Sequence, residues 1–570
     1  MTKHSRRRTI LTLVALLALP LLGCTSGGTS SRTDELVLTS PQPTLTSDND
    51  SVDRAELKVG GTLTTAIDEI SPQLNVLHRD SQVSTQTLWS WYNPQVILST
   101  ATGESYPNPA YISDRQVSTV DGNTVLTMTF VDAARFNDGT PMDWRTIEST
   151  WIANRGDNGY DHRGSTGYDS IASVARGESD KQAVVTFSGS FAWTDALFFN
   201  VIHPAVDSAD KFNTAYLDDS HAEWGAGPYK IETWDAGSGT VTFAPNENWW
   251  GDPPLLDERT FVVMNSVAAL NAFKAGDLDL VATGTADRLE QVEAMQGTTS
   301  YRAANVSNTM LFVNAARPQF SDLATRQALF MAIDRERVKD EVFEGLDYYE
   351  SPVGSAVLYP FQQGYDDSLA AAGYTFNVAE ANNLLDEAGW TTEADGTRVR
   401  DGVRFEGEMP IFDDDPAVES RAYVIRQQLR AIGFDLKVTT HPSTEFSSVL
   451  REKNWDLMTL TFSSSDAYGA MWMCQVYCVD GALNFSGAMP EAFQSLIQER
   501  VDGEPSKEAQ VKAAMDLEPQ LMRESWGFLP LYNGPVIKTA KAGLANLDPE
   551  PYKGLDMFGI QPVEDVGWME

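Results

Sequence analysis

The residues able to carry out catalysis do not form a known motif in this sequence. There is no Gly-x-Ser-x-Gly nucleophile turn, no His-Glu-x-x-His pair and no Gly-rich phosphate-binding loop. The histidines, which are scattered and lie in loop-like contexts, are His4, His78, His162, His203, His221 and His441. We therefore predict a protein that is not an enzyme. The 80 Asp and Glu residues still leave a glycosidase-like carboxylate pair open as an alternative.

A hydroxyl-rich segment with one carboxylate follows an apolar stretch late in the chain. Residues 455–462 predict a strand, and the segment after it contains Ser463, Ser464, Ser465, Asp466 and Trp472. Open α/β sheets bind ligands beyond the carboxyl ends of their strands, so this segment predicts a ligand site. The alternative is that Asp466 is a turn residue that caps a helix over residues 467–476.

The N-terminus has the pattern of an export signal. Four basic residues precede an apolar run over residues 9–22, which is shorter than the roughly 20 residues that a membrane span needs. Leu21-Leu22-Gly23-Cys24 looks like a lipobox, so residues 1–23 are expected to be removed and Cys24 to carry the lipid that holds the protein on the membrane. Arg7-Arg8 leaves the twin-arginine route open beside the general one.

The next segment, residues 24–57, is rich in Ser, Thr, Gly, Asp and Pro and predicts a flexible tether. The whole chain has a formal net charge of −38. A field of this sign repels nucleic acid, so a nucleic-acid-binding role is excluded.

The two remaining cysteines, Cys474 and Cys478, are separated by three residues in a chain expected to be exported. An oxidising compartment favours a local disulfide between them. Met471 and Met473 lie nearby and would suit a soft metal, but no histidine is close enough to complete a site. We expect a disulfide, with no metal and no cofactor.

The elements that must position these residues alternate between strands and helices. Residues 311–314 predict a strand, Ser321 a helix start and Asp334 the start of a second helix. Strands are also predicted over residues 124–130 and 434–438, and further helices are expected at residues 84–97 (ending before Pro94), 143–152, 377–388 and 419–432. This alternation predicts an α/β protein.

Several of these segments match the sequence motifs of one protein family, in the same order along the chain. They are Gly60-Gly61-Thr62-Leu63, Phe136 to Pro141, Gly225 to Tyr229, Asn246 to Trp250, the stretch 311–338, Leu384 to Trp390 and Phe528 to Tyr532. These motifs resemble those of the family 5 solute-binding proteins of ABC importers, which are receptors of the oligopeptide and dipeptide type. The resemblance covers about residues 59–532.

The resemblance implies a two-lobe periplasmic-binding-protein fold of the α/β class (type II, cluster C-like), with a ligand cleft and a hinge between the lobes. The first lobe would take residues 58–308, with an extra subdomain at about 80–222, and the second lobe residues 309–531. Residues 532–570 would return to the first lobe. The protein would be a monomer that delivers oligopeptides to a transmembrane permease driven by ATPase subunits.

The resemblance also implies the site. Peptide-binding relatives carry Trp-x-x-Asp in this loop, and Asp466 matches the Asp that pairs with the α-ammonium group of the ligand. Ser463 stands where the family has Trp, and Ser464, Ser465 and Trp472 are expected beside the ligand. Further candidates are Trp91, Asp80 and Ser81, with Trp91 also interpretable as a core residue. A partner for the ligand carboxylate is expected, with Arg404 and Arg421 as candidates.

Alternatives remain within and outside this class. Members of the family also bind metal chelates, haem, sugars and lipid-linked glycans, so the solute could be one of these. A different class would be a cell-envelope scaffold or regulator that kept the fold without transport. The enzyme alternative is an exported glycosidase or peptidase.

Overall fold

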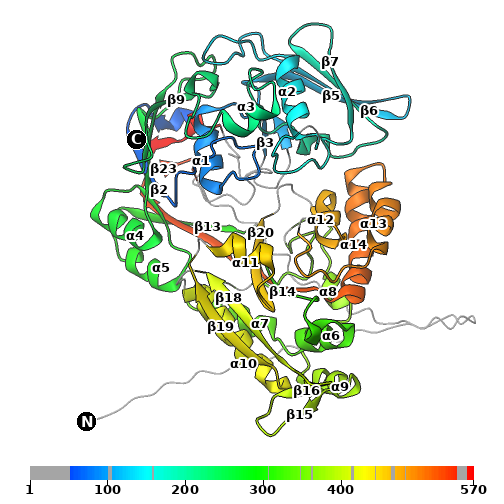
Figure 1. The fold of residues 1–570 in the computed structure, drawn as a ribbon. Coiled ribbons are helices and arrows are strands. Elements are labelled where there is room, and N and C mark those ends of the chain that lie inside the picture. Colours follow the sequence, from blue (N-terminus) through cyan, green and yellow to red (C-terminus); the bar gives the residue numbers. More distant parts are fainter. Residues whose placement is uncertain are drawn as a thin grey trace, which may run out of the picture. The chain divides into compact units, whose positions relative to one another are not determined.

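A computed structural model gives the fold (Figure 1). The chain divides into two units, Met1–Gln42 and Pro43–Glu570. The described residues, all in the second unit, are 52–99, 105–156, 159–305, 307–346, 348, 350–360, 362, 364–412, 416–442, 445–463, 469–481, 483–547 and 562–570. Cys24 and residues 24–51 of the predicted tether lie outside them.

The largest sheet has seven strands in the order β13-β22-β12-β2-β11-β10-β9. Its strands are β2 (Thr62–Ile67), β9 (Tyr229–Asp235), β10 (Thr240–Pro245), β11 (Glu258–Val263), β12 (Leu280–Ala282), β13 (Thr298–Ala304) and β22 (Pro535–Lys541). Side chains of β2 alternate between buried and more exposed positions, as a sheet with one covered face requires. β22 pairs antiparallel with β12 and β13, so the end of the chain joins a sheet built from its beginning.

Helices α1 (Val83–Tyr92), α4 (Ser266–Ala275) and α5 (Ala286–Glu293) accompany this sheet. Its core includes Leu63, Trp91, Tyr229 and Phe261. The short strands β1 (Leu57–Lys58), β23 (Leu544–Ala545) and β24 (Gly567–Met569) form a small sheet of their own.

A four-stranded antiparallel sheet with the order β5-β6-β8-β7 is formed within the first half of the chain. It contains β5 (Ile112–Val120), β6 (Asn123–Phe130), β7 (Ile171–Arg176) and β8 (Gln182–Phe187), next to α2 (Trp144–Asn154). Buried and partly exposed residues alternate along β6, as predicted for residues 124–130. We call its core, which runs from Val96 to Ala226, the four-stranded core.

A three-stranded sheet, β20-β14-β21, lies in the second half of the chain. Its strands are β14 (Ser307–Val313), β20 (Leu457–Ser463) and β21 (Phe528–Tyr532), and a parallel pair is formed by β18 (Glu406–Phe412) and β19 (Asp435–His441). The surrounding helices are α6 (Leu323–Met331), α7 (Arg335–Val342), α8 (Ser368–Ala371), α9 (Val378–Glu387), α10 (Pro416–Leu429), α11 (Phe446–Glu452), α12 (Met473–Tyr477), α13 (Ala492–Ile497) and α14 (Lys507–Ser525). Their apolar faces meet in the largest core, which we call the three-stranded core.

The helix starts in this part follow from capping side chains. Asp334 accepts a hydrogen bond from the Arg337 backbone at the start of α7, as predicted. The predicted cap Ser321 is wrong, because Asp322 accepts from the Thr325 backbone and begins α6 one residue later. The carboxylate of Asp322 also forms an ion pair with Arg400, which an uncharged serine hydroxyl could not form.

Candidate ligand-binding site

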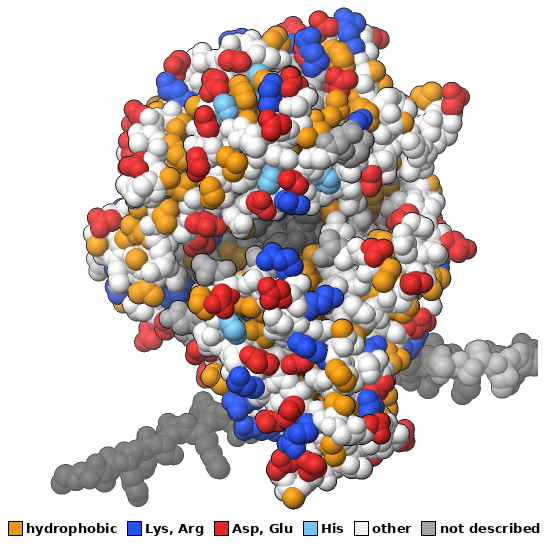
Figure 2. All heavy atoms as spheres, in the orientation of Figure 1, with side chains coloured by type: hydrophobic (Ala, Val, Ile, Leu, Met, Phe, Trp, Pro, Cys, Tyr) orange, Lys and Arg blue, Asp and Glu red, His pale blue; other side chains and the backbone are white. Residues whose placement is uncertain are grey.

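A cavity of about 300 Å³ is lined by residues from both halves of the chain. Ligand pockets in proteins have volumes of about 300–1,000 Å³, so this one falls at the small end. Its wall contains Leu77, Asn154, Arg163, Gly164, Thr166, Tyr168, Ala196, Leu197, Phe199, Asn200, Asn308, Met310, Ala356, Val357, Tyr359, Phe462, Gly469, Trp472, Met473, Gln475, Val476, Tyr477 and Leu483. Figure 2 shows a surface that is hollowed near the middle of the view, with acidic and basic side chains around the hollow.

Two asparagines in this wall have buried amide atoms without a hydrogen-bond partner. Asn200 is 2% exposed, and neither its amide nitrogen nor its amide oxygen is paired. Asn308 donates to the Ser355 carbonyl (2.9 Å), but its oxygen is unpaired. An unpaired buried polar atom costs about 1–3 kcal/mol. These amides are therefore suited to a ligand that supplies hydrogen-bonding groups.

The indole of Trp472 offers a third group of this kind. Its Nε1 is buried without a hydrogen-bond partner, and the residue lies in the cavity wall. Trp472 was predicted as a site residue from its place after the Ser463–Asp466 segment. An indole N–H can only donate, so it would face an acceptor on the ligand.

One wall residue carries a formal charge. Among the residues that the structure describes, Arg163 is the single Arg, Lys, Asp or Glu that lines the cavity. The rest of the described wall is apolar, aromatic or neutral and polar. Guanidinium groups in proteins frequently bind carboxylates in a bidentate manner.

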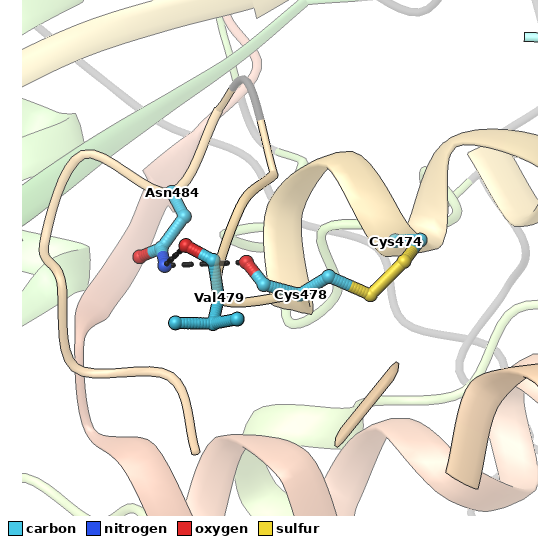
Figure 3. The surroundings of a disulfide bond; sticks show 4 residues. All are labelled: Cys474, Cys478, Val479 and Asn484. Carbon is cyan, nitrogen blue, oxygen red and sulfur yellow. Dashed lines mark hydrogen bonds between the residues drawn. A yellow bond between two sulfur atoms is a disulfide. The ribbon is translucent and has the colours of Figure 1, made fainter. Parts of the chain in front are cut away.

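A disulfide supports the wall at α12 (Figure 3). It joins Cys474 to Cys478 across one helical turn, and the Cys478 backbone N–H donates to the Cys474 carbonyl (2.9 Å). The amide of Asn484 donates to the carbonyls of Cys478 (3.2 Å) and Val479 (3.1 Å). A five-residue helix is too short to be stable alone, so these links hold the turn from which Met473 and Tyr477 face the cavity.

Behind this wall lies Glu518, a fully buried carboxylate on α14. Its Oε1 accepts hydrogen bonds from the Tyr477 hydroxyl (2.8 Å) and the Ala356 backbone (2.8 Å), and its Oε2 accepts from the Ser355 hydroxyl (2.5 Å). Burial raises the pKa of Glu518, and these donors oppose the shift. Tyr477 and Ala356 both line the cavity, so Glu518 holds two separate parts of its wall.

A second set of contacts joins the segment that follows β8 to α14. Trp193 is 3% exposed and packs in the three-stranded core, and its indole N–H donates to Gln510 (2.5 Å). Asp195 forms an ion pair with Lys507, whose ammonium lies 5.5 Å from the centre of the Trp193 ring. Ala196 and Leu197, which follow directly, line the cavity. One short segment therefore both bounds the cavity and binds the opposite half of the chain.

Several predicted site residues lie in or beside the loop after β20. Ser464, Ser465 and Asp466 fall outside the described residues, and Ser463 is the last residue of β20, with its side chain likewise outside them. The described residues on either side, Phe462 and Gly469, both line the cavity.

The three candidates near α1 do not lie in the cavity wall. Trp91 packs in the core of the seven-stranded sheet against Tyr229 and Phe261, with Arg259 over its ring (4.8 Å), so its interpretation as a core residue holds. Asp80 is exposed and lines a separate surface depression, and Ser81 is buried.

The two arginines predicted for the ligand carboxylate are engaged elsewhere. Arg404 pairs with Glu393, Asp395 and Glu406 beside a small sheet. Arg421 donates to the Tyr532 hydroxyl (2.7 Å) and to Thr459 (3.0 Å). Neither lines the cavity.

The sequence did not reveal three residues of the wall, Arg163, Asn200 and Asn308. No local pattern marks an amide or guanidinium group that reaches a cavity only after folding.

Two of the histidines are buried and have packing roles, and His221 and His441 pair with Glu223 and Glu445. His203 lies against Phe136 and Trp224, and burial lowers its pKa. His78 is buried beside Phe212 and its pKa is lowered for the same reason.

Within the described part of the chain, no three His, Cys, Asp or Glu side chains are grouped as a metal site. No helix among the described residues is long and apolar enough to cross a bilayer.

Known proteins resemble this chain over nearly its whole length. The oligopeptide-binding protein OppA of Mycobacterium tuberculosis is 27% identical over 557 residues, which cover 96% of this chain and 92% of that protein. Among solved structures, the periplasmic EDTA-binding protein EppA aligns with a TM-score of 0.82 at 22% identity, covering 92% of this chain and 98% of that one. The oligopeptide-binding protein AppA of Bacillus subtilis, solved with a nonapeptide, aligns with a TM-score of 0.73 at 19% identity, covering 90% and 100%.

These alignments confirm the predicted solute-binding-protein fold, a mixed α/β architecture. The model of the bacterial extracellular solute-binding proteins, family 5, matches residues 102–477. This range is more than half of the chain. The protein therefore belongs to the family 5 bacterial extracellular solute-binding proteins, which are binding components of ABC transporters and not enzymes.

Proposed function

We propose that this protein captures peptides in the described cavity and delivers them to a permease with its ATPase subunits. The observation that carries the proposal is the wall itself, in which the unpaired amide atoms of Asn200 and Asn308 lie among apolar and aromatic side chains. Amide groups bind the peptide backbone regardless of side-chain identity. The similarity to mycobacterial OppA supports the same solute class.

Asp466 is proposed to pair with the α-ammonium group of the peptide. Phe462 and Gly469, on either side of residues 463–468, both line the cavity, and six residues span at most about 22 Å when fully extended. A buried ammonium requires a fixed anion, because an unpaired buried charge is very costly. Ser464 and Ser465 would add hydroxyl contacts beside it, and Ser463 would border the same loop.

Arg163 is proposed to bind the carboxylate of the peptide. It is the one formally charged residue in the described wall, and its guanidinium matches a carboxylate in charge and geometry. It is preferred to Arg404 and Arg421 because it lines the cavity and they do not.

The receptor is proposed to be held on the outer face of the membrane by lipid on Cys24, and to work as a monomer. Ligand that contacts wall residues from both halves of the chain would favour the closed arrangement over an open one. The lobes would comprise residues 58–308 and 309–531, with the tail from residue 532 returning to the first.

A metal chelate is the second candidate solute. EppA, with the highest TM-score among the structures compared above, is named for EDTA binding, and Arg163 would suit a polycarboxylate. The two solutes differ in one respect: a peptide brings an ammonium group that a polycarboxylate chelate lacks.

Native mass spectrometry of the purified protein tests the proposal, with any bound mass identified after denaturation. A series of short peptides, reduced in Asp466→Ala and in Arg163→Met, is the expected result. A chelate lost only in Arg163→Met would replace the peptide by the second candidate. No bound mass, together with no thermal stabilisation by peptide pools, would overturn both.

A further inference from the structure

We infer that Glu518 is ionised and that its charge, one residue behind the cavity wall, selects ligands that carry a cationic group. This inference rests on the proposed function and identifies a specificity-determining residue of the same site. It does not concern Asp466, which belongs to a different segment and would contact the ligand directly.

The hydrogen bonds around Glu518 are those of an anion. The Ser355 hydroxyl oxygen accepts from the backbone N–H groups of Val357 (2.9 Å) and Leu358 (3.0 Å), so both its lone pairs are used. Its own proton can go to Glu518 Oε2 (2.5 Å) or to the Met515 sulfur (3.8 Å), and the nearer carboxylate oxygen is much the stronger acceptor. The Ala356 backbone can only donate, and it meets Oε1. The carboxylate is therefore surrounded by donors.

No cation forms an ion pair with this carboxylate within the described part of the chain; the buried guanidinium of Arg335 acts on the neighbouring Tyr365 instead. The groups that stabilise the charge of Glu518 are the hydroxyls of Ser355, Ser368 and Tyr477 and one backbone N–H, all neutral. A second tyrosine, Tyr365, lies near enough for the charge of Glu518 to raise the pKa of its hydroxyl. Buried carboxylates are usually paired, because a single charge in a low-dielectric interior is costly.

The cavity lies on the other side of the residues that hold Glu518. Ala356 and Tyr477 contact Glu518 through a backbone N–H and a hydroxyl, and both also line the cavity. A ligand in the cavity is separated from the carboxylate only by these two residues, and the same wall shields it from water. Coulomb attraction across about 10 Å at an effective dielectric constant of about 20 corresponds to a change in affinity of roughly tenfold.

The experiment compares two probes, trialanine and N-acetyl-trialanine, in the full-length protein. For Glu518→Gln, the affinity for trialanine is expected to fall about tenfold while the affinity for the acetylated probe stays within about twofold. Asp516→Asn, an exposed acid on the same helix paired with Lys512, serves as the matched control and should affect neither.

Equal losses for both probes in Glu518→Gln would reduce Glu518 to a structural role and overturn the inference. If this variant does not fold, Ser355→Ala takes its place, since loss of that donor favours protonation of the carboxylate and should weaken trialanine selectively. Infrared difference spectra of the ligand-free protein against the variant give an independent test. A protonated-carboxyl band that disappears in Glu518→Gln would overturn the inference, and a carboxylate band would support it. A wild-type protein that binds neither probe contradicts the proposed function, and the infrared result still decides the charge of Glu518.

Discussion

Trp193 and Gln510 lie 317 residues apart in the sequence, and the indole N–H of the first donates to the side-chain oxygen of the second at 2.5 Å. The bond is buried, and the residues beside it, Asp195 and Lys507, form an ion pair. Ala196 and Leu197, which follow this contact in the sequence, line the cavity. The same short segment therefore closes the cavity and packs against the other half of the chain.

Loss of this hydrogen bond is expected to weaken the closed arrangement. Trp193→Phe keeps an aromatic ring but leaves the Gln510 oxygen buried without its donor, a cost of about 1–3 kcal/mol. Ligand dissociation, followed by stopped-flow fluorescence, should become faster by about tenfold or more. The matched control is Trp568→Phe, which removes an indole hydrogen bond to Thr62 in an exposed setting. Equal dissociation rates in the two variants would contradict the role of Trp193.

Removal of the Cys474–Cys478 disulfide is expected to reduce ligand affinity more than overall stability. The loop it closes is short, so the chain-entropy contribution is only about 2 kcal/mol. Without it, α12 is a single turn that is unstable by itself, although Met473 and Tyr477 on it line the cavity. Calorimetric titration of the Cys474→Ser/Cys478→Ser variant measures the effect. An unchanged affinity would show that Asn484 and the surrounding packing suffice.

Asn200 should contribute to binding at the expense of stability. Asn200→Leu removes two unpaired buried polar atoms, so the ligand-free protein is expected to gain about 1–3 kcal/mol of unfolding free energy while ligand affinity falls. Asn75→Leu provides the contrast, since its amide donates to the Phe212 carbonyl (2.9 Å) and accepts from the Leu77 backbone (3.1 Å). That variant should be destabilised. Urea unfolding with and without ligand distinguishes the two, and a destabilised Asn200→Leu would mean that its amide is satisfied.

Glu564 should make stability depend on pH. Burial raises its pKa from 4.5 to about 7, so the folded state holds a proton that the unfolded state has already lost. Stability contributed by this group is expected to fall as pH rises from about 4.5 to 7, by about 3 kcal/mol in all, and then to level off.

The test compares urea unfolding at pH 5, 7 and 8.5 in wild type, Glu564→Gln and the exposed control Glu232→Gln. Glu564→Gln should lose this part of the pH dependence and be the more stable protein at pH 8.5. A pH profile that does not differ from that of the control would contradict the raised pKa.

The acidic side chains are distributed over the face of the molecule that Figure 2 shows. In Figure 2 acidic side chains are spread across the visible face and do not form a single patch. The net charge of −38 therefore fits solubility better than a dedicated cationic partner.

Local structure was largely readable from the sequence. β21 spans Phe528–Tyr532, one of the segments that match the family's motifs, Asp334 and Asn377 cap their helices, and Gly433 ends the helical segment after α10 with a left-handed backbone. Each depends on residues within a few positions of one another, and capping or alternation is a local property. The ordered family motifs extended this to the fold and the solute-binding class.

The ligand site was determined by tertiary structure. Trp91 looked available for stacking, but the seven-stranded sheet buries it against Tyr229 and Phe261. Asn200, Asn308 and Glu518 carry no local signal, and their importance comes from a cavity formed by segments hundreds of residues apart. Sequence determines which groups a chain carries and which local elements they join. Whether a polar group is paired, exposed or left facing a cavity depends on long-range packing, since desolvation and hydrogen bonding are decided by neighbours that are distant along the chain.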